Sequence, residues 1–110
     1  MEWKNLLAGL RVRGDLESLA DQVASRCRPA AWNASHARAL GMRLSEARGY
    51  MRVKSGPVLR AEVAALAAGR PELSALLQRE VFELAGERLV KTLISDLLNF
   101  NLARRSRRAA

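Results

Sequence analysis

The chain has 110 residues and a formal net charge of +8, with 19 Lys and Arg against 11 Asp and Glu. This length fits one domain that buries roughly two-thirds of the surface of its unfolded chain. The single cysteine, Cys27, excludes an intramolecular disulfide, no stretch approaches the roughly 20 apolar residues of a membrane-spanning helix, and the N-terminus lacks a signal-like apolar run. We therefore expect a cytoplasmic protein.

The composition favours helices. Alanine and leucine are the commonest residues, and both lose little conformational freedom in a helix. Apolar positions recur with helical spacing from end to end, and no segment alternates as a strand would. The predicted fold is an all-α bundle of five or six helices with a long C-terminal helix.

The first two predicted helices meet near residue 14. Apolar residues over 3–13 indicate a short first helix that ends at Gly14. Asp15 is a suitable N-cap for a second helix over 16–27, because its carboxylate accepts from free backbone N–H groups. The apolar stripe of that second helix is the most regular in the chain.

Two further helices follow. Pro29 suits the first turn of the third, which Gly41 closes. Ser45 is the expected N-cap of the fourth, and the pair Gly56-Pro57 either kinks that helix or ends it and starts another. A helix-turn-helix motif over Leu19–Leu40 is disfavoured, since its turn lacks glycine and its would-be recognition surface has little to hydrogen-bond.

The last predicted segment, Glu72–Leu102, is about 45 Å long if it is unbroken. A compact domain of this size has a radius of gyration of about 13 Å, so the helix would overhang its own core. Its apolar stripe also turns by roughly half a turn after Gly86. Either the helix breaks there, or one face meets a second chain in a homodimer, through Leu89, Leu93, Leu97 and Phe100.

Candidate catalytic and metal-binding residues are few. Cys27 and His36, each the only residue of its type, lie on faces predicted to be buried. Glu80, Glu83 and Glu87 share a helix face, but di-metal bundles also need Glu-x-x-His motifs, and none is present. We therefore predict no enzyme, no cofactor and no metal, and we interpret the three glutamates as a solvated face.

Two basic segments favour nucleic acid as a partner. One is a basic helix, and the other is a C-terminal arginine tail that supplies half of the net charge. Tyr50 could stack on a base, but it also falls on the predicted buried side. The candidate residues are Arg48, Arg52, Lys54 and Arg60 in the helix, and Arg104, Arg105, Arg107 and Arg108 in the tail. A membrane partner is disfavoured, because the helix before the tail carries few cations.

Residues 1–103 thus form one predicted helical domain, and 104–110 a basic, disordered tail. No motif is specific enough to indicate a family. The first hypothesis is a non-enzymatic interaction module that binds a protein partner or self-associates as a homo-oligomer through its C-terminal helix. The alternative is a sequence-nonspecific nucleic-acid-binding protein. Whether the arginine excess is functional or compositional stays open.

Overall fold

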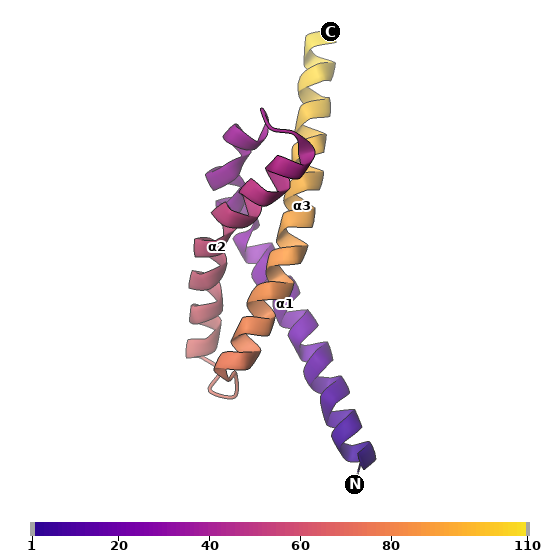
Figure 1. The fold of residues 1–110 in the computed structure, drawn as a ribbon, viewed down its shortest axis with the longest axis vertical. Coiled ribbons are helices and arrows are strands. Elements are labelled where there is room, and N and C mark those ends of the chain that lie inside the picture. The colour runs from indigo at the N-terminus through magenta and orange to yellow at the C-terminus, as the bar shows by residue number, and fades with distance from the viewer. Residues whose placement is uncertain (1, 110) are drawn as a thin grey trace.

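The computed structural model describes the backbone of residues 2–109 and the side chains of residues 14–107. It contains three helices: α1 (Glu2–Ala39), α2 (Leu44–Ala68) and α3 (Ala75–Ala109), joined by two short connections (Figure 1). No strand occurs in this described part of the chain. The all-α prediction is confirmed, but the count of five or six helices is wrong.

The breaks expected near Gly14 and Pro29 do not occur, because α1 runs through both. Gly14 keeps a negative φ and continues the helix instead of capping it. Pro29 removes one N–H donor, but it lies on the exposed side of α1, where water replaces the lost bond. The predicted first, second and third helices are therefore one element, and Asp15 lies inside it.

Helix α2 is continuous through Gly56-Pro57 and changes direction part-way along its length (Figure 1). Pro57 cannot donate to the carbonyl of Val53, and both residues are exposed, so the bend leaves that carbonyl in water. Of the two outcomes predicted, a kink is the one observed. The N-cap is Arg43, without a side-chain cap, instead of Ser45.

Helix α3 passes Gly86 without a break and includes 104–109, the segment expected to form a disordered tail. The molecule measures 65 × 26 × 21 Å, with a radius of gyration of 17.1 Å, against about 13 Å for a compact domain of this length. The beginning of α1 and the end of α3 project from opposite ends (Figure 1). The overhang predicted from helix length is present.

The winding stripe of α3 is buried within the single chain. Its most deeply buried side chains recur every four residues, and each such step advances about 40° around the helix. They are Val81, Ala85, Leu89, Leu93 and Leu97. Helix α3 lies parallel to α1, since Asp21 and Arg28 contact Arg88 and Asp96 in the same order. It lies antiparallel to α2, since 45–52 face 87–94 whereas 60–64 face 78–83. Neither a helix break nor a second chain is needed to bury the stripe.

Small residues fill much of the rest of the core, which lets the helices approach closely. Fully buried alanines occur on all three helices: Ala20, Ala31, Ala39, Ala47 and Ala85. The buried hydroxyls of Ser35 and Ser55 donate to the carbonyls four residues earlier, at 2.7 and 2.6 Å, so neither is left unsatisfied. Within the described helices, none is both long and apolar enough to cross a bilayer.

Candidate nucleic-acid interface

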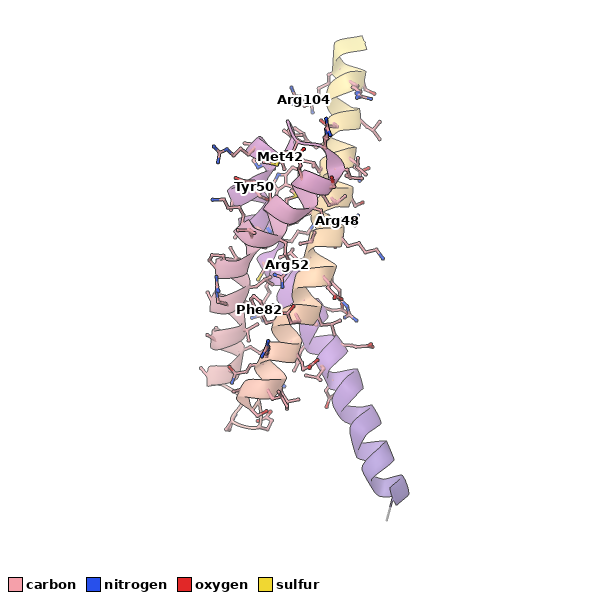
Figure 2. The ribbon with its side chains drawn as sticks, viewed as in Figure 1. Met42, Arg48, Tyr50, Arg52, Phe82 and Arg104 are labelled. Carbon is pink, nitrogen blue, oxygen red and sulfur yellow. The ribbon has the colours of Figure 1, made fainter. Side chains whose placement is uncertain are left out.

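A groove of about 740 Å³ separates the N-terminal half of α2 from α3. Its α2 wall carries Arg48 and Arg52, one turn apart, and its α3 wall carries Lys91. Val90 and Ile94 supply apolar lining. Figure 2 shows Arg48 and Arg52 along the line where α2 faces α3. The two arginines that sequence spacing placed on one helix face therefore line one cavity.

Arg52 is held across the floor of this groove. Its guanidinium lies over the ring of Phe82, 5.1 Å from the centroid, and Nη2 lies 3.5 Å from Oε2 of Glu83. A methyl group added at Gly86 would lie 2.5 Å from Cζ of Arg52. The absence of a side chain at Gly86 thus makes room for Arg52.

A second hollow, of about 350 Å³, lies between α2 and α3 nearer the other end of α2. Arg60 and Arg79 line this hollow, and Phe82 and Glu83, the two residues that touch Arg52, connect it to the first. We call the two hollows together the basic groove. It carries five basic side chains, Arg48, Arg52, Arg60, Arg79 and Lys91, against two acidic ones, Glu83 and Glu87.

The boundaries between α1 and its neighbours differ from the basic groove, because their arginines have partners. Arg28 binds both carboxylate oxygens of Asp96 on α3, at 2.9 and 2.5 Å. This hydrogen bonding raises the pKa of Arg28 further above its usual range. Arg26 lies 3.3 Å from Oε1 of Glu62 on α2. We call these boundaries the paired seams.

Arg88 completes the paired seams. Its Nη1 donates to Oδ1 of Asp21 at 2.6 Å and to the carbonyl of Glu17 at 2.8 Å, both on α1. In the basic groove, by contrast, Arg52 is the one cation with a carboxylate within 4.0 Å, counting the side chains of residues 14–107. Within residues 14–107, four cations without a carboxylate this close therefore line the boundary between α2 and α3, and others, among them Lys54, Arg70 and Arg104, are exposed elsewhere.

The other predicted nucleic-acid-binding residues lie elsewhere. Lys54 places its Nζ over the ring of Tyr50, 5.8 Å from the centroid, and does not line the groove. Arg104, Arg105 and Arg107 are exposed near the end of α3, and Figure 2 shows Arg104 well beyond Arg48. The side chain of Arg108 lies outside the described residues. Sequence reasoning missed Lys91 and Arg79, since only the packing of α2 on α3 brings them to the groove.

The residues predicted to mediate self-association are mostly core. Leu89 and Leu93 are fully buried and Leu97 is 4% exposed, so in this fold they offer no surface to a second chain. Phe100 is 39% exposed. Two leucines near it on α3, Leu98 and Leu102, are more exposed, at 48% and 60%.

The candidate catalytic and metal-binding residues take ordinary structural places. Burial, helped by the charge of Glu62, raises the pKa of Cys27 to about 11, so its thiol is protonated at neutral pH. Nδ1 of His36 hydrogen-bonds the carbonyl of Trp32 at 2.8 Å. In residues 14–107, no three His, Cys, Asp or Glu side chains gather to hold a metal. The three glutamates predicted to be solvated, Glu80, Glu83 and Glu87, are exposed.

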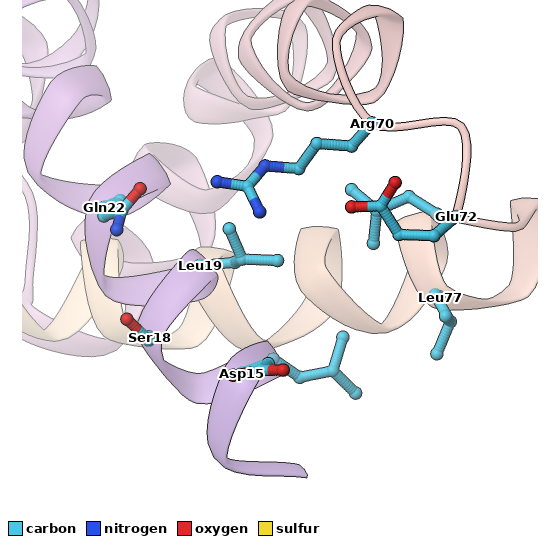
Figure 3. Close-up of a pocket in the computed structure, with 9 residues that line it drawn as sticks. Asp15, Ser18, Leu19, Gln22, Arg70, Glu72 and Leu77 are labelled. Atoms are coloured by element: carbon cyan, nitrogen blue, oxygen red, sulfur yellow. The ribbon is translucent and has the colours of Figure 1, made fainter. Parts of the chain in front are cut away.

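A further hollow, of about 360 Å³, lies between α1 and the connection from α2 to α3. Figure 3 shows Arg70 and Glu72 from that connection opposite Asp15 and Ser18 on α1. One cation meets two carboxylates there, so this hollow has no excess of positive charge. Its mixed lining favours no class of ligand.

Comparison with known proteins gave no match to a family model, a curated protein or a solved structure. The function must therefore be argued from the geometry of this chain.

Proposed function

We propose that the protein is a non-enzymatic binding module whose basic groove holds the phosphate backbone of a nucleic acid without reading base sequence. The observation that carries this proposal is the contrast in charge pairing. Arginines on the paired seams are compensated by carboxylates, whereas four of the five cations in the groove, counted within residues 14–107, have no carboxylate within 4.0 Å. Phosphates would neutralise them and release counterions.

The shape of the groove suits a chain of phosphates. Arg48 and Arg52 project from one wall and Lys91 from the other, so a strand lying between α2 and α3 is contacted from both sides. Guanidinium groups bind phosphate with two parallel hydrogen bonds, and lysine acts as a point charge. The apolar side chains of Val90 and Ile94 offer no hydrogen bonds to base edges, which supports binding without sequence preference.

The exposed arginines at the end of α3 extend the same positive field. Arg104, Arg105 and Arg107 lie beyond the core on α3, where their side chains are exposed. Their contribution is long-range attraction of a polyanion, which raises the rate of association and weakens with salt.

Fluorescence anisotropy with a labelled oligonucleotide across a salt series tests this function. The variant R48Q/R52Q removes two charges from the groove, and the control R26Q/R88Q removes two from the paired seams. On a single strand we expect the groove variant to flatten the slope of log K against log salt by about 1.4, two phosphate contacts at about 0.7 each. Equal losses in both variants, or no binding by the unaltered protein at about 0.1 M salt, would contradict the proposal.

Self-association is the second candidate, favoured by the exposed leucines at the end of α3. Leu98 and Leu102 lie one turn apart on one helix face and are 48% and 60% exposed. Because both are exposed in the single chain, L98E/L102E should remain folded. A fall in mass by sedimentation equilibrium, with an unchanged circular dichroism spectrum, supports a homo-oligomer built on this face. A monomeric mass for the unaltered protein contradicts it.

A further inference from the structure

An aromatic cluster lies where the second half of α1 meets α3, on the opposite side of α3 from the basic groove. The rings of Trp32 and His36 are stacked, with centroids 4.8 Å apart and planes 12° apart. Phe100 meets both rings edge-on, at 5.8 and 6.2 Å. Trp32 and His36 are half-buried and Phe100 is 39% exposed, so the core does not enclose the cluster. We call these three residues the aromatic cluster.

A hollow of about 290 Å³ lies beside the indole of Trp32. Pro29 and the Arg28–Asp96 pair form its other walls. Pro29 precedes Trp32 by one helical turn and His36 follows it by one turn, so the hollow and His36 lie on opposite sides of the indole. The walls are an indole ring, a pyrrolidine ring and a planar guanidinium whose position is fixed by two hydrogen bonds to a carboxylate. Such a hollow suits a flat ring.

Positive charge adjoins the cluster. Arg104 and Arg107 follow Phe100 by four and seven residues, which places all three on one face of α3. Both arginines are exposed. A ligand that combines a planar ring with a phosphate therefore matches the cluster together with this end of α3.

We propose that the aromatic cluster stacks an unpaired nucleobase, so that the nucleic acid bound by this protein is single-stranded. The inference rests on the proposed function and names its ligand more closely. Every base has a π-face and stacks on an aromatic side chain irrespective of sequence, whereas bases in a duplex are already stacked on one another. The arginines at the end of α3 attract the phosphate on that side of the stacked base.

The first experiment compares three labelled ligands by fluorescence anisotropy at one salt concentration: a 12-residue thymidine strand, an abasic strand of the same length, and a 12-base-pair duplex. The abasic strand keeps the phosphates and lacks only the rings. Stacking of one base is worth about 5- to 100-fold in affinity, so we expect the thymidine strand to bind tighter than the abasic strand by this factor.

The second measurement uses tryptophan emission. The chain has two tryptophans, and the substitution W3F leaves Trp32 as the sole emitter. We expect the thymidine strand to quench this emission and the abasic strand to bind without quenching it. Because this test leaves the cluster intact, it does not depend on a cluster variant that folds.

Variants assign the effect to the cluster. F100A should lower the ratio of thymidine to abasic affinity toward one, whereas L76A, which removes an exposed side chain near the start of α3, should leave the ratio unchanged. W32F, which retains an aromatic ring, should preserve most of the ratio. Circular dichroism checks that each variant is folded.

The outcomes separate the inference from the proposed function. Equal affinities for the thymidine and abasic strands, or a duplex that binds as tightly as the thymidine strand, overturn the inference and leave the basic groove as a phosphate site. If none of the three ligands binds, both proposals are overturned. Tighter binding of the thymidine strand, with quenching of Trp32 and loss of the preference in F100A, supports the inference.

Discussion

The paired seams and the basic groove are built from similar residues and differ in what faces each cation. Along α1, Arg26, Arg28 and Arg88 meet carboxylates on the neighbouring helix at 2.5 to 3.3 Å. Between α2 and α3, Arg48 and Lys91 line an open cavity and have no such partner within residues 14–107. The difference shows that a net charge of +8 says less about function than the places where the fold leaves that charge uncompensated.

The pairing of cations with carboxylates also bears on whether the high arginine content is functional or the result of compositional drift. Arginines accumulated by compositional drift have no reason to converge on one cavity. In residues 14–107, five cations without a carboxylate partner line a cavity, four of them in the two hollows between α2 and α3 and one, Arg70, in the hollow beside α1. Our proposal for the basic groove rests on this uneven distribution of ion pairs.

The largest expected effect is on the core that both regions share. Leu93 is fully buried, so L93A should lower the free energy of unfolding by about 2–5 kcal/mol, through lost burial and a residual cavity. The control L98A, at a position 48% exposed, should change it by less than about 0.5 kcal/mol. Urea denaturation with sedimentation analysis measures both. A change of mass in L93A without loss of stability would place Leu93 in an interface between chains.

The next effect compares thiol reactivity in the two regions. Cys27 lies at the α1–α2 seam with a pKa raised to about 11, so at pH 8 its thiolate fraction is about 100-fold below that of a thiol with a pKa of 9.0. Labelling by a thiol reagent should therefore be slow in the native protein. The matched variant S45C/C27A places the thiol in the basic groove and should react quickly. Equal rates would mean that Cys27 is accessible.

The same pKa predicts how stability depends on pH. The native state keeps the Cys27 proton up to about pH 11, whereas an unfolded thiol loses it near pH 9.0. Between these values the unfolded state binds fewer protons, so the contribution of Cys27 is complete below pH 9 and is lost as pH rises toward 11. Comparison of urea midpoints for C27A and the unaltered protein over this range isolates the effect. A pH-independent difference would contradict the assignment.

A smaller effect compares one cation from each region. R88A removes contacts with Asp21 and with the carbonyl of Glu17, and should lower the free energy of unfolding by about 1 kcal/mol, less at high salt. R48A removes no ion pair recorded in the described structure, and should change it by less than about 0.5 kcal/mol. Urea denaturation at two salt concentrations tests the pair. A larger loss in R48A than in R88A would show that Arg48 supports the fold.

The smallest effect concerns two glycines that face the groove. G49A meets no atom within 4 Å and should stabilise α2 by about 0.5–1 kcal/mol, because alanine loses less backbone entropy in a helix. G86A gains the same entropic stabilisation, but its methyl group displaces the guanidinium of Arg52 from its contacts with Phe82 and Glu83. The increase in stability should be smaller in G86A. Equal increases would show that the position of Arg52 contributes nothing.

Helical periodicity predicted the class of fold and the burial of Cys27, because burial of an apolar stripe follows from spacing alone. The number of helices did not follow. Gly14 adds an entropy cost to a helix, and Pro29 removes one of its hydrogen bonds. Whether either residue ends the helix depends on tertiary contacts and solvent, which the local sequence pattern does not show. The structure has three long helices where the sequence pattern predicted five or six shorter ones.

The candidate site residues likewise include some that helical spacing predicted and others that only tertiary packing brings together. Arg48 and Arg52 were predicted together, because four residues make one helical turn. Lys91 lies 39 positions beyond Arg52, and only the register of α2 against α3 brings them to one cavity. Leu93 was assigned to a contact between chains, since a winding stripe indicates a crossing neighbour without showing to which chain that neighbour belongs.

The extended shape has a mechanical consequence. Glu2 and Ala109 mark opposite ends of a molecule 65 Å long and at most 26 Å across (Figure 1). A molecule of this shape keeps groups attached at its two ends far apart. Two fluorophores placed at the termini should therefore transfer energy weakly in the native state, and transfer should not rise on unfolding, because an unfolded chain of this length has an average end-to-end distance of about 80 Å.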